Sequence, residues 1–176
     1  YVQFGVSVTF LVGTIFGLIS MISPALIMAD GKPDKITKKI SQLSALKEGA
    51  RYVFKHPILP GLYLLDVGVT ILSFYRMLFP LFSQGLYGMG AEGTGLLASA
   101  NALGGVLGSL VVLFTEKIKS KGKIVLYSTI AYAIGLILFG LNPIFWVGLL
   151  IVAILGATDS VGMTMRQTIV QLTTPD

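Results

Sequence analysis

Long apolar runs, separated by short polar connectors, dominate the pattern of residues along this chain. Two of these runs, Ile124–Leu141 and Ile144–Ala157, meet at Asn142–Pro143. The stretch from Ile124 to Met165 contains no Lys or Arg. A helix needs about 20 mostly apolar residues to cross the roughly 30 Å of hydrocarbon in a bilayer. The pattern therefore predicts an integral membrane protein.

Five apolar runs have the length of membrane spans. They are too long for the strands of a membrane barrel, and an open strand edge is not tolerated in hydrocarbon. We therefore expect an all-α fold, a polytopic transmembrane helical bundle. The predicted helices are Val2–Ile27, Ile58–Phe82, Leu96–Phe114, Ile124–Leu141 and Ile144–Gln171.

The distribution of basic residues over the connectors predicts the side of the membrane that each connector faces. Lys and Arg are frequent in Met28–Pro57 and in Thr115–Lys123. The connectors Ser83–Gly95 and Asn142–Pro143 contain neither. Because basic loops stay in the cytoplasm, the sequence predicts an N-terminus outside the cell and a C-terminus in the cytoplasm.

The long basic connector contains one further predicted helix. Leu43, Leu46, Ala50, Val53 and Phe54 fall on a single helical face, with charged residues on the other side. This pattern predicts an amphipathic helix that lies along the inner membrane surface. The alternative is a solvated linker with some helical structure.

Composition supports the membrane assignment and excludes several classes of function. Hydrophobic residues make up 54% of the chain and charged residues 12%, with a mean hydropathy of +0.84. The absence of Cys excludes disulfides and thiolate metal sites. Most of the net charge of +5 lies in the connectors, so it does not indicate nucleic-acid binding. No metalloprotease, phosphate-loop or serine-hydrolase motif occurs, so nothing supports an enzyme, a metal site or a cofactor.

Four charged residues lie inside predicted spans, where charge is costly and usually marks function. Asp66 and Arg76 belong to the second span, and Asp159 and Arg166 to the fifth. At about 1.5 Å per residue, Asp66 lies about 12 Å above the cytoplasmic start of its span, and Asp159 about 22 Å from the outer start of its own. The two carboxylates are therefore expected in the inner half of the membrane, at similar depths.

The second span also carries a polar stripe. At about 100° per residue, Thr70, Ser73, Pro80 and Gln84 project close to the direction of Asp66. Such a stripe is expected to face a cavity or neighbouring helices, because polar side chains are costly in lipid.

Two functional hypotheses for the charges follow, with one structural alternative. Asp66 or Asp159 carries a coupling proton or pairs with a cation, because a low dielectric favours the neutral form of a carboxyl group. Arg166 joins a salt bridge at an inner gate. In the alternative, the carboxylates are held by hydroxyls or helix ends, while Arg76 and Arg166 extend to the membrane interfaces.

Small residues predict where helices pack closely. Gly13–Gly17 and Gly104–Gly108 both have glycines four residues apart within apolar runs, a spacing typical of close helix crossings in membranes. Asn101, a polar residue in the third span, is expected to hydrogen-bond across helices or to line a cavity.

Several motifs, in their order and spacing, resemble transporters of the major facilitator superfamily. More narrowly, they resemble the branch that contains the enterobactin exporter and the macrolide efflux proteins. Gly49–Pro57 is similar to the exit of the family's central loop. Leu78–Phe82 and Gly95–Gly104 are similar to its seventh and eighth spans, and Arg166–Thr168 and Gln171–Asp176 to the end of its tenth.

The resemblance implies that the chain is an internal part of a longer polypeptide, about the sixth to tenth of twelve spans. Residues 1–27 are then the last span of the N-terminal half, 28–57 the cytoplasmic central loop, and 58–176 the first four spans of the C-terminal half. The resemblance further implies a bacterial inner-membrane protein that binds substrate between its halves and works by alternating access.

The leading functional hypothesis is a secondary transporter that exports a small amphipathic molecule, drug-like or siderophore-like, with protons as the coupling ion. Its partners are then the substrate, the lipid bilayer, protons and the remaining spans. The alternatives are an uptake symporter and a non-transporting membrane scaffold. Candidate residues for substrate binding or proton coupling are Asp66, Thr70, Ser73, Arg76, Asn101, Asp159, Arg166 and Gln167.

Overall fold

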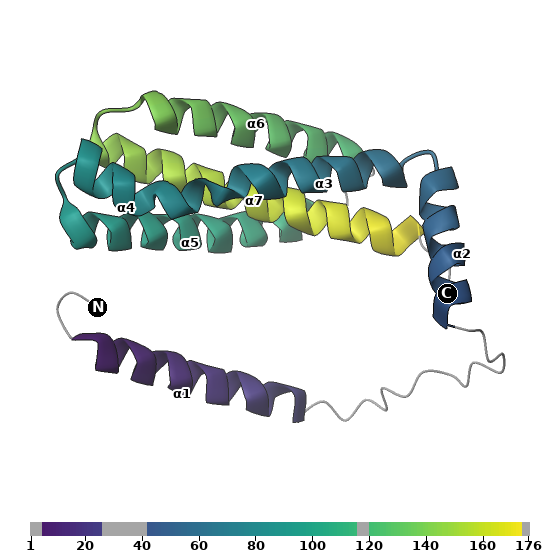
Figure 1. Cartoon of the computed structure of the whole chain (residues 1–176), viewed down its shortest axis with the longest axis horizontal. Helices are drawn as coiled ribbons and strands as arrows, with labels where there is room; N and C mark the ends of the chain where they lie inside the picture. The colour runs from purple at the N-terminus through teal and green to yellow at the C-terminus, as the bar shows by residue number, and fades with distance from the viewer. Residues whose placement is uncertain (1–4, 26–41, 116–119, 174–176) are drawn as a thin grey trace. The chain divides into compact units, whose positions relative to one another are not determined.

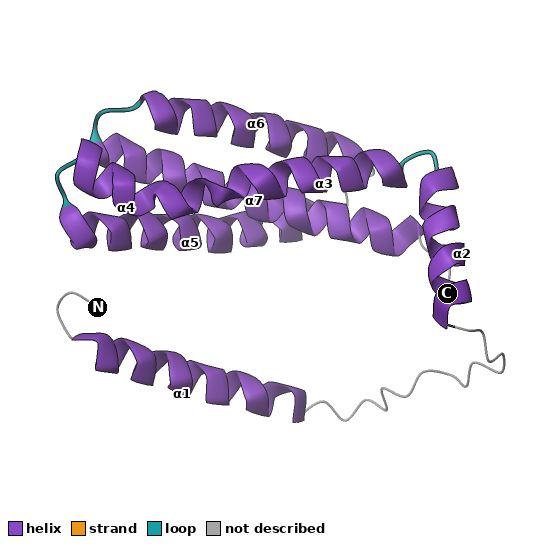
Figure 2. Cartoon of the chain, in the orientation of Figure 1, coloured by secondary structure: helices purple, strands orange, loops and turns teal. Residues whose placement is uncertain are grey.

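The computed structural model describes residues 5–25, 42–115 and 120–173, and these residues form helices joined by short turns (Figures 1 and 2). The chain divides into two compact units, Tyr1–Ala50 and Arg51–Asp176. The first unit contains helix α1 (Gly5–Ala25) and most of α2 (Gln42–Lys55). The predicted connectors at 28–41 and 116–119 lie outside the described residues.

The second unit contains four helices that are long and apolar enough to cross a membrane. The first of them, Leu59–Leu86, is continuous but changes its winding along its length. The other three are α5 (Gly90–Thr115), α6 (Lys121–Leu141) and α7 (Phe145–Thr173). Together with the shorter apolar helix Ser7–Ile22 in the first unit, they confirm the predicted all-α membrane bundle.

The first long helix of the second unit consists of four segments. It starts as the α-helix α3 (Leu59–Ser73), tightens into the 3-10 helix η1 (Phe74–Leu78), and passes through α4 (Phe79–Leu81) into the π-helix η2 (Phe82–Leu86). Pro80 accounts for part of the change, because proline removes a backbone donor and its ring crowds the preceding turn.

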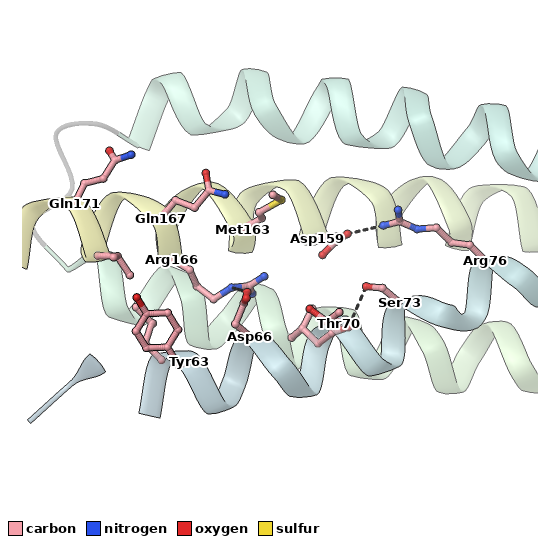
Figure 3. Close-up of a pocket in the computed structure, with 13 residues that line it drawn as sticks. Tyr63, Asp66, Thr70, Ser73, Arg76, Asp159, Met163, Arg166, Gln167 and Gln171 are labelled. Carbon is pink, nitrogen blue, oxygen red and sulfur yellow. Dashed lines mark hydrogen bonds and ion pairs between the residues drawn. The ribbon is translucent and has the colours of Figure 1, made fainter. Parts of the chain in front are cut away.

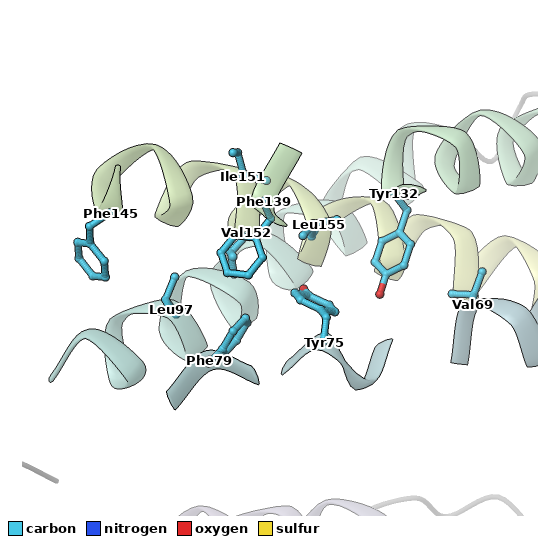
Figure 4. Close-up of a cluster of buried hydrophobic side chains, with 10 residues drawn as sticks. All are labelled: Val69, Tyr75, Phe79, Leu97, Tyr132, Phe139, Phe145, Ile151, Val152 and Leu155. Carbon is cyan, nitrogen blue, oxygen red and sulfur yellow. The ribbon is translucent and has the colours of Figure 1, made fainter. Parts of the chain in front are cut away.

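Helix α7 is the central helix of the second unit and packs most extensively against α5 and α6. Buried side chains from α3 to α7 meet around it (Figure 4). Aromatic rings dominate this cluster: Phe82 and Phe139 lie 4.7 Å apart between centroids, and Tyr75 lies edge-on to Tyr132. The buried cluster consists of Val69, Tyr75, Phe79, Leu97, Tyr132, Phe139, Phe145, Ile151, Val152 and Leu155.

The contact between α5 and α7 depends on glycine. A Cβ atom added to Gly104 would lie 1.8 Å from the Ala153 carbonyl oxygen, and one added to Gly108 would lie 2.3 Å from that of Ala157. On α7, a Cβ added to Gly156 would lie 2.1 Å from the backbone carbonyl oxygen of Asn101 on α5. The close crossing predicted for Gly104–Gly108 is therefore confirmed, whereas the one for Gly13–Gly17 stays a prediction.

The largest differences from the predicted helix boundaries lie at the end of the second span and the start of the third. The second predicted span continues to Leu86 and the third begins at Gly90, so most of the predicted connector Ser83–Gly95 is helical. The actual turn lies at Gly88 and Gly90, whose φ angles of +64° and +58° favour glycine. The polar, glycine-rich start of α5 resembled a loop in composition, but Glu92 suits a helix N-terminus because its charge complements the helix dipole.

Helix α2 confirms that a helix occupies the end of the basic connector. Its apolar residues Leu43, Leu46 and Phe54 are exposed, as an amphipathic helix at a membrane surface requires. Within the second unit, the Tyr52 hydroxyl donates a hydrogen bond to the Thr173 carbonyl at the end of α7. The location of this helix at the membrane surface stays a prediction.

Candidate functional site

A cavity of about 420 Å³ lies between α7 and the continuous segment α3–η1 (Figure 3). Its volume falls in the range of about 300–1,000 Å³ that is usual for small-molecule sites. Its walls combine charged, amide, hydroxyl and apolar side chains. The lining residues are Leu62, Tyr63, Asp66, Val69, Thr70, Ser73, Arg76, Asp159, Met163, Arg166, Gln167, Val170 and Gln171.

Two ion pairs cross the cavity, and they differ in which helix supplies the arginine and which the aspartate. Nη2 of Arg76 lies 2.6 Å from Oδ2 of Asp159 and donates a hydrogen bond to it. Nε of Arg166 lies 2.8 Å from Oδ1 of Asp66. Each helix therefore supplies one acid and one base, and each charge is matched by the opposite charge on the other helix. The four side chains together carry no net charge, which lowers the cost of placing them within a membrane span.

Arg166 is the most deeply buried of the four charged residues, with 6% of its surface exposed. Its Nε makes no hydrogen bond within the described part of the chain, so the contact with Asp66 is an ion pair without hydrogen-bond alignment. A buried charge is strongly destabilising when its partner is removed. The stability of this part of the structure is thus expected to depend on the carboxylate of Asp66.

Gly162 provides the space in which the Arg166 guanidinium lies. A Cβ at Gly162 would be 3.3 Å from Nη1 of Arg166 and 3.0 Å from Oγ of Ser128 on α6. The arginine side chain extends from its own Cα toward the N-terminus of α7, the usual direction for long side chains on a helix. A glycine one turn earlier leaves that path open.

The tighter winding after Ser73 brings Arg76 into line with the polar stripe. In a 3-10 helix, with three residues per turn, side chains at i and i+3 eclipse. Arg76 lies in η1 and therefore projects in the same direction as Ser73. At about 100° per residue it would lie about 60° from Ser73, so the tighter winding improves an alignment that a regular helix already allows. Pro80 and Gln84, predicted in the stripe from regular helix geometry, do not line the cavity.

Hydroxyl groups connect the cavity wall to the neighbouring helix α6. The Ser73 hydroxyl donates to the Val69 carbonyl and lies 3.0 Å from the Tyr132 hydroxyl. These contacts fix the last turn of α3 at the point where the winding changes. Thr70 is exposed to the cavity one turn earlier.

The structure brings most of the sequence-predicted candidates to this one cavity and leaves Asn101 outside it. The Asn101 amide donates to the Tyr75 hydroxyl at 2.8 Å and to the Val152 carbonyl at 3.4 Å. It therefore hydrogen-bonds across helices, the first of its two predicted roles. The predicted candidates that line the cavity are Asp66, Thr70, Ser73, Arg76, Asp159, Arg166 and Gln167.

The observed pairing corrects two of the expectations for the charged residues. Arg76 and Arg166 pair with carboxylates, so the alternative in which both extend separately to the interfaces is wrong. Asp66 and Asp159 also do not share a level, because Asp66 lies beside Arg166, two helical turns from Asp159 on α7. Counting rise from the outer start of the fifth span assumed a membrane of about 30 Å, whereas α7 has 29 residues and is about 43 Å long, so Asp159 lies farther from the inner end of its helix than predicted.

Sequence reasoning missed Tyr63, Met163 and Gln171, which also line the cavity. A signal for one of them was present: Met163 follows Asp159 at an offset of 4, a position that shares a helical face with it. Within the described helices, no group of three His, Asp or Glu side chains is placed to hold a metal ion.

Comparison with known proteins supports the assignment suggested by the motifs. The family model described as Major Facilitator Superfamily matches residues 1–176. The proteins named enterobactin exporter EntS from Escherichia coli O1:K1 / APEC, Escherichia coli O9:H4 (strain HS) and Shigella boydii serotype 18 are each 28% identical to this chain. These matches extend over 165 residues, which are 93% of this chain and 38% of each relative. No solved structure gives a significant match.

The chain thus spans 38% of the length of the curated relatives that it matches. Its four membrane-length helices and the short apolar helix agree with a partial bundle of the kind that such transporters contain. Since the family model covers the whole sequence, the chain belongs to the major facilitator superfamily.

Proposed function

We propose that this chain forms about the sixth to tenth spans of a twelve-span secondary transporter in the bacterial inner membrane. The transporter exports a small amphipathic molecule, siderophore-like or drug-like, by alternating access. Family membership and the relatives named as enterobactin exporters support the class and the direction. In this arrangement the cavity between α3 and α7 faces the N-terminal half of the protein, and the substrate binds between the halves.

The observation that carries the proposal is the pair of crossed ion pairs facing a common cavity. Packing between two helices does not require charge, and charged residues within spans usually mark a transport pathway. A transporter, unlike a scaffold, needs polar positions that converge on a shared cavity: Asp66, Ser73 and Asp159 do so, and Asn101 does not. This distribution favours transport over a purely structural role.

For proton coupling, we propose Asp66 and Asp159 as the candidate groups. Protonation of either carboxylate would remove its attraction for the paired arginine and loosen the contact between α3 and α7. Two helices held by charge in one state and released in another provide the two arrangements that alternating access needs.

The transport proposal predicts uphill substrate movement driven by a proton gradient. In proteoliposomes that contain the complete transporter, we expect an imposed pH gradient to drive accumulation of enterobactin or another amphipathic siderophore, and a protonophore to abolish it. Asp159→Asn is expected to reduce gradient-driven transport roughly 100-fold, since a positioned proton-transferring side chain contributes on the order of 10²–10⁴ to a rate. Asp159→Glu is the matched control. Transport by the wild-type protein at the same rate with and without the pH gradient would contradict proton coupling. The absence of any transport would contradict the proposed function.

The proposed threading has a separate test, because the chain contains no native Cys. Single cysteines at Glu92 and Lys123, both exposed, mark the two ends of the helical pair α5 and α6. We expect a membrane-impermeant maleimide to label Glu92→Cys in intact cells, and Lys123→Cys only after permeabilisation, because Lys123 belongs to a basic connector. Labelling of Lys123→Cys in intact cells would show that the helices cross the membrane in the orientation opposite to the proposed one.

A further inference from the structure

The two ion pairs differ in which partner is accessible. In the pair near Tyr63, the Asp66 side chain is 53% exposed and the Arg166 side chain 8%. In the pair near Ser73, the Arg76 side chain is 45% exposed and the Asp159 side chain 18%. The buried member of each pair holds the accessible member in place. The cavity therefore presents an accessible guanidinium at the Arg76 end and an accessible carboxylate farther along, before Tyr63 and Gln171 (Figure 3).

Both accessible groups have hydrogen-bonding capacity to spare. Arg166 approaches one oxygen of Asp66, and a carboxylate accepts through two oxygens. Arg76 uses Nη2 toward Asp159, and a guanidinium has five N–H donors. Each group can therefore bind an opposite charge on a ligand without giving up its protein partner.

The axial spacing of the two backbone positions that carry the accessible charges follows from the winding of the helix. From Asp66 to Ser73 the chain is α-helical, and from Ser73 to Arg76 it is a 3-10 helix. At about 1.5 Å per residue in the first part and about 2.0 Å in the second, the two positions are roughly 16 Å apart along the axis. The wall between and around them includes the apolar side chains of Val69 and Met163.

We propose that the cavity binds an elongated dipolar amphipathic molecule, with a cationic group near Asp66, an anionic group near Arg76 and an apolar middle. This inference rests on the proposed function, because it names the substrate class of the same cavity. The neutral sum of the four cavity charges supports a ligand without net charge. A ligand with a single charge would carry an uncompensated charge into a low-dielectric region, which is costly.

A matched series of straight-chain probes tests the inference on the complete transporter in lipid nanodiscs. The zwitterion 12-aminododecanoate, the anion dodecanoate and the cation dodecylamine share one apolar chain and differ in their charged ends. We expect the zwitterion to bind at least about tenfold more tightly than either singly charged probe, a difference of about 1.4 kcal/mol. Equal binding, or tighter binding of a singly charged probe, overturns the proposal.

Two variants assign the ends of the bound probe. Asp66→Asn is expected to lower the affinity for the zwitterion to that for dodecanoate, and Arg76→Gln to that for dodecylamine. If both variants lost the preference for the zwitterion over the same singly charged probe, the assigned orientation would be contradicted. If either variant fails to fold, the wild-type protein still tests the inference with shorter and longer amino acids of the same series. The affinity is expected to peak at one chain length if both charged ends bind at once, and that length spans less than the roughly 16 Å between the two backbone positions, because the Arg76 side chain extends toward Asp159 (Figure 3).

The failure of this inference can be distinguished from the failure of the proposed function. If the proteoliposomes transport a siderophore but show no preference for the dipolar probe, the substrate class is wrong while the transport function stands. If they neither bind nor transport any amphipathic probe, both are wrong.

Discussion

Asp66→Asn is expected to destabilise the folded protein by about 1–3 kcal/mol and to reduce transport roughly 100-fold. The substitution leaves the buried guanidinium of Arg166 without its carboxylate. Breaking a fully buried pair costs about 3–5 kcal/mol, and the exposure of Asp66 lowers that value because solvent screens the charge. Chemical unfolding in nanodiscs measures the stability, and substrate transport in proteoliposomes measures the activity.

The double variant Asp66→Asn/Arg166→Gln separates the two effects. It removes both charges, so no buried charge is left unpaired, and stability is expected to return toward that of the wild type. Transport is expected to stay low, because the titratable group is still missing. Asp66→Glu is the conservative control and should retain part of the activity. A double variant as unstable as Asp66→Asn would contradict the proposed dependence of Arg166 on Asp66.

Gly162→Ala tests the same contact without changing any charge. The added methyl group would lie 3.3 Å from Nη1 of Arg166 and 3.0 Å from Oγ of Ser128, so both side chains must shift by a few tenths of an ångström. We expect a smaller loss of stability than in Asp66→Asn, of about 1 kcal/mol, in line with mild overpacking. A loss of the same size in the Asp66→Asn background would mean that the methyl group acts independently of the ion pair.

The membrane helices could be predicted from the sequence because the signal is redundant. Each span contains many apolar residues, and one misplaced residue does not hide the pattern. The start of α5 could not be predicted, because Gly90–Gly95 has the composition of a loop and only its continuation into Leu96 makes it helical. A turn determined by two positive φ angles, at Gly88 and Gly90, is not distinguishable in sequence from the other glycines nearby.

The candidate site was predictable by residue type and not by geometry. Charge within an apolar span identified Asp66, Arg76, Asp159 and Arg166, because such charge is rare. Their pairing depends on where the helix tightens, and no regular projection predicts that Arg76 eclipses Ser73. The direction of Arg76 therefore depends on an irregular winding that local propensity does not specify.

Gly104→Ala is expected to destabilise the second unit by about 3 kcal/mol or more, at or beyond the usual upper end of overpacking. The new Cβ would lie 1.8 Å from the Ala153 carbonyl oxygen and 2.9 Å from its Cα. These are backbone atoms of α7, which cannot move aside as a flexible side chain would. The helices α5 and α7 must separate, and each loses contacts that lipid does not replace with the same packing.

Gly95→Ala is the matched control, because Gly95 lies on the same helix and a Cβ there would meet nothing within 4 Å among the described residues. It should leave stability unchanged or raise it by up to about 1 kcal/mol, since alanine favours a helix more than glycine does. Unfolding of both variants in nanodiscs, monitored by circular dichroism, measures the difference. Equal stability of the two variants would show that α5 and α7 do not approach through Gly104.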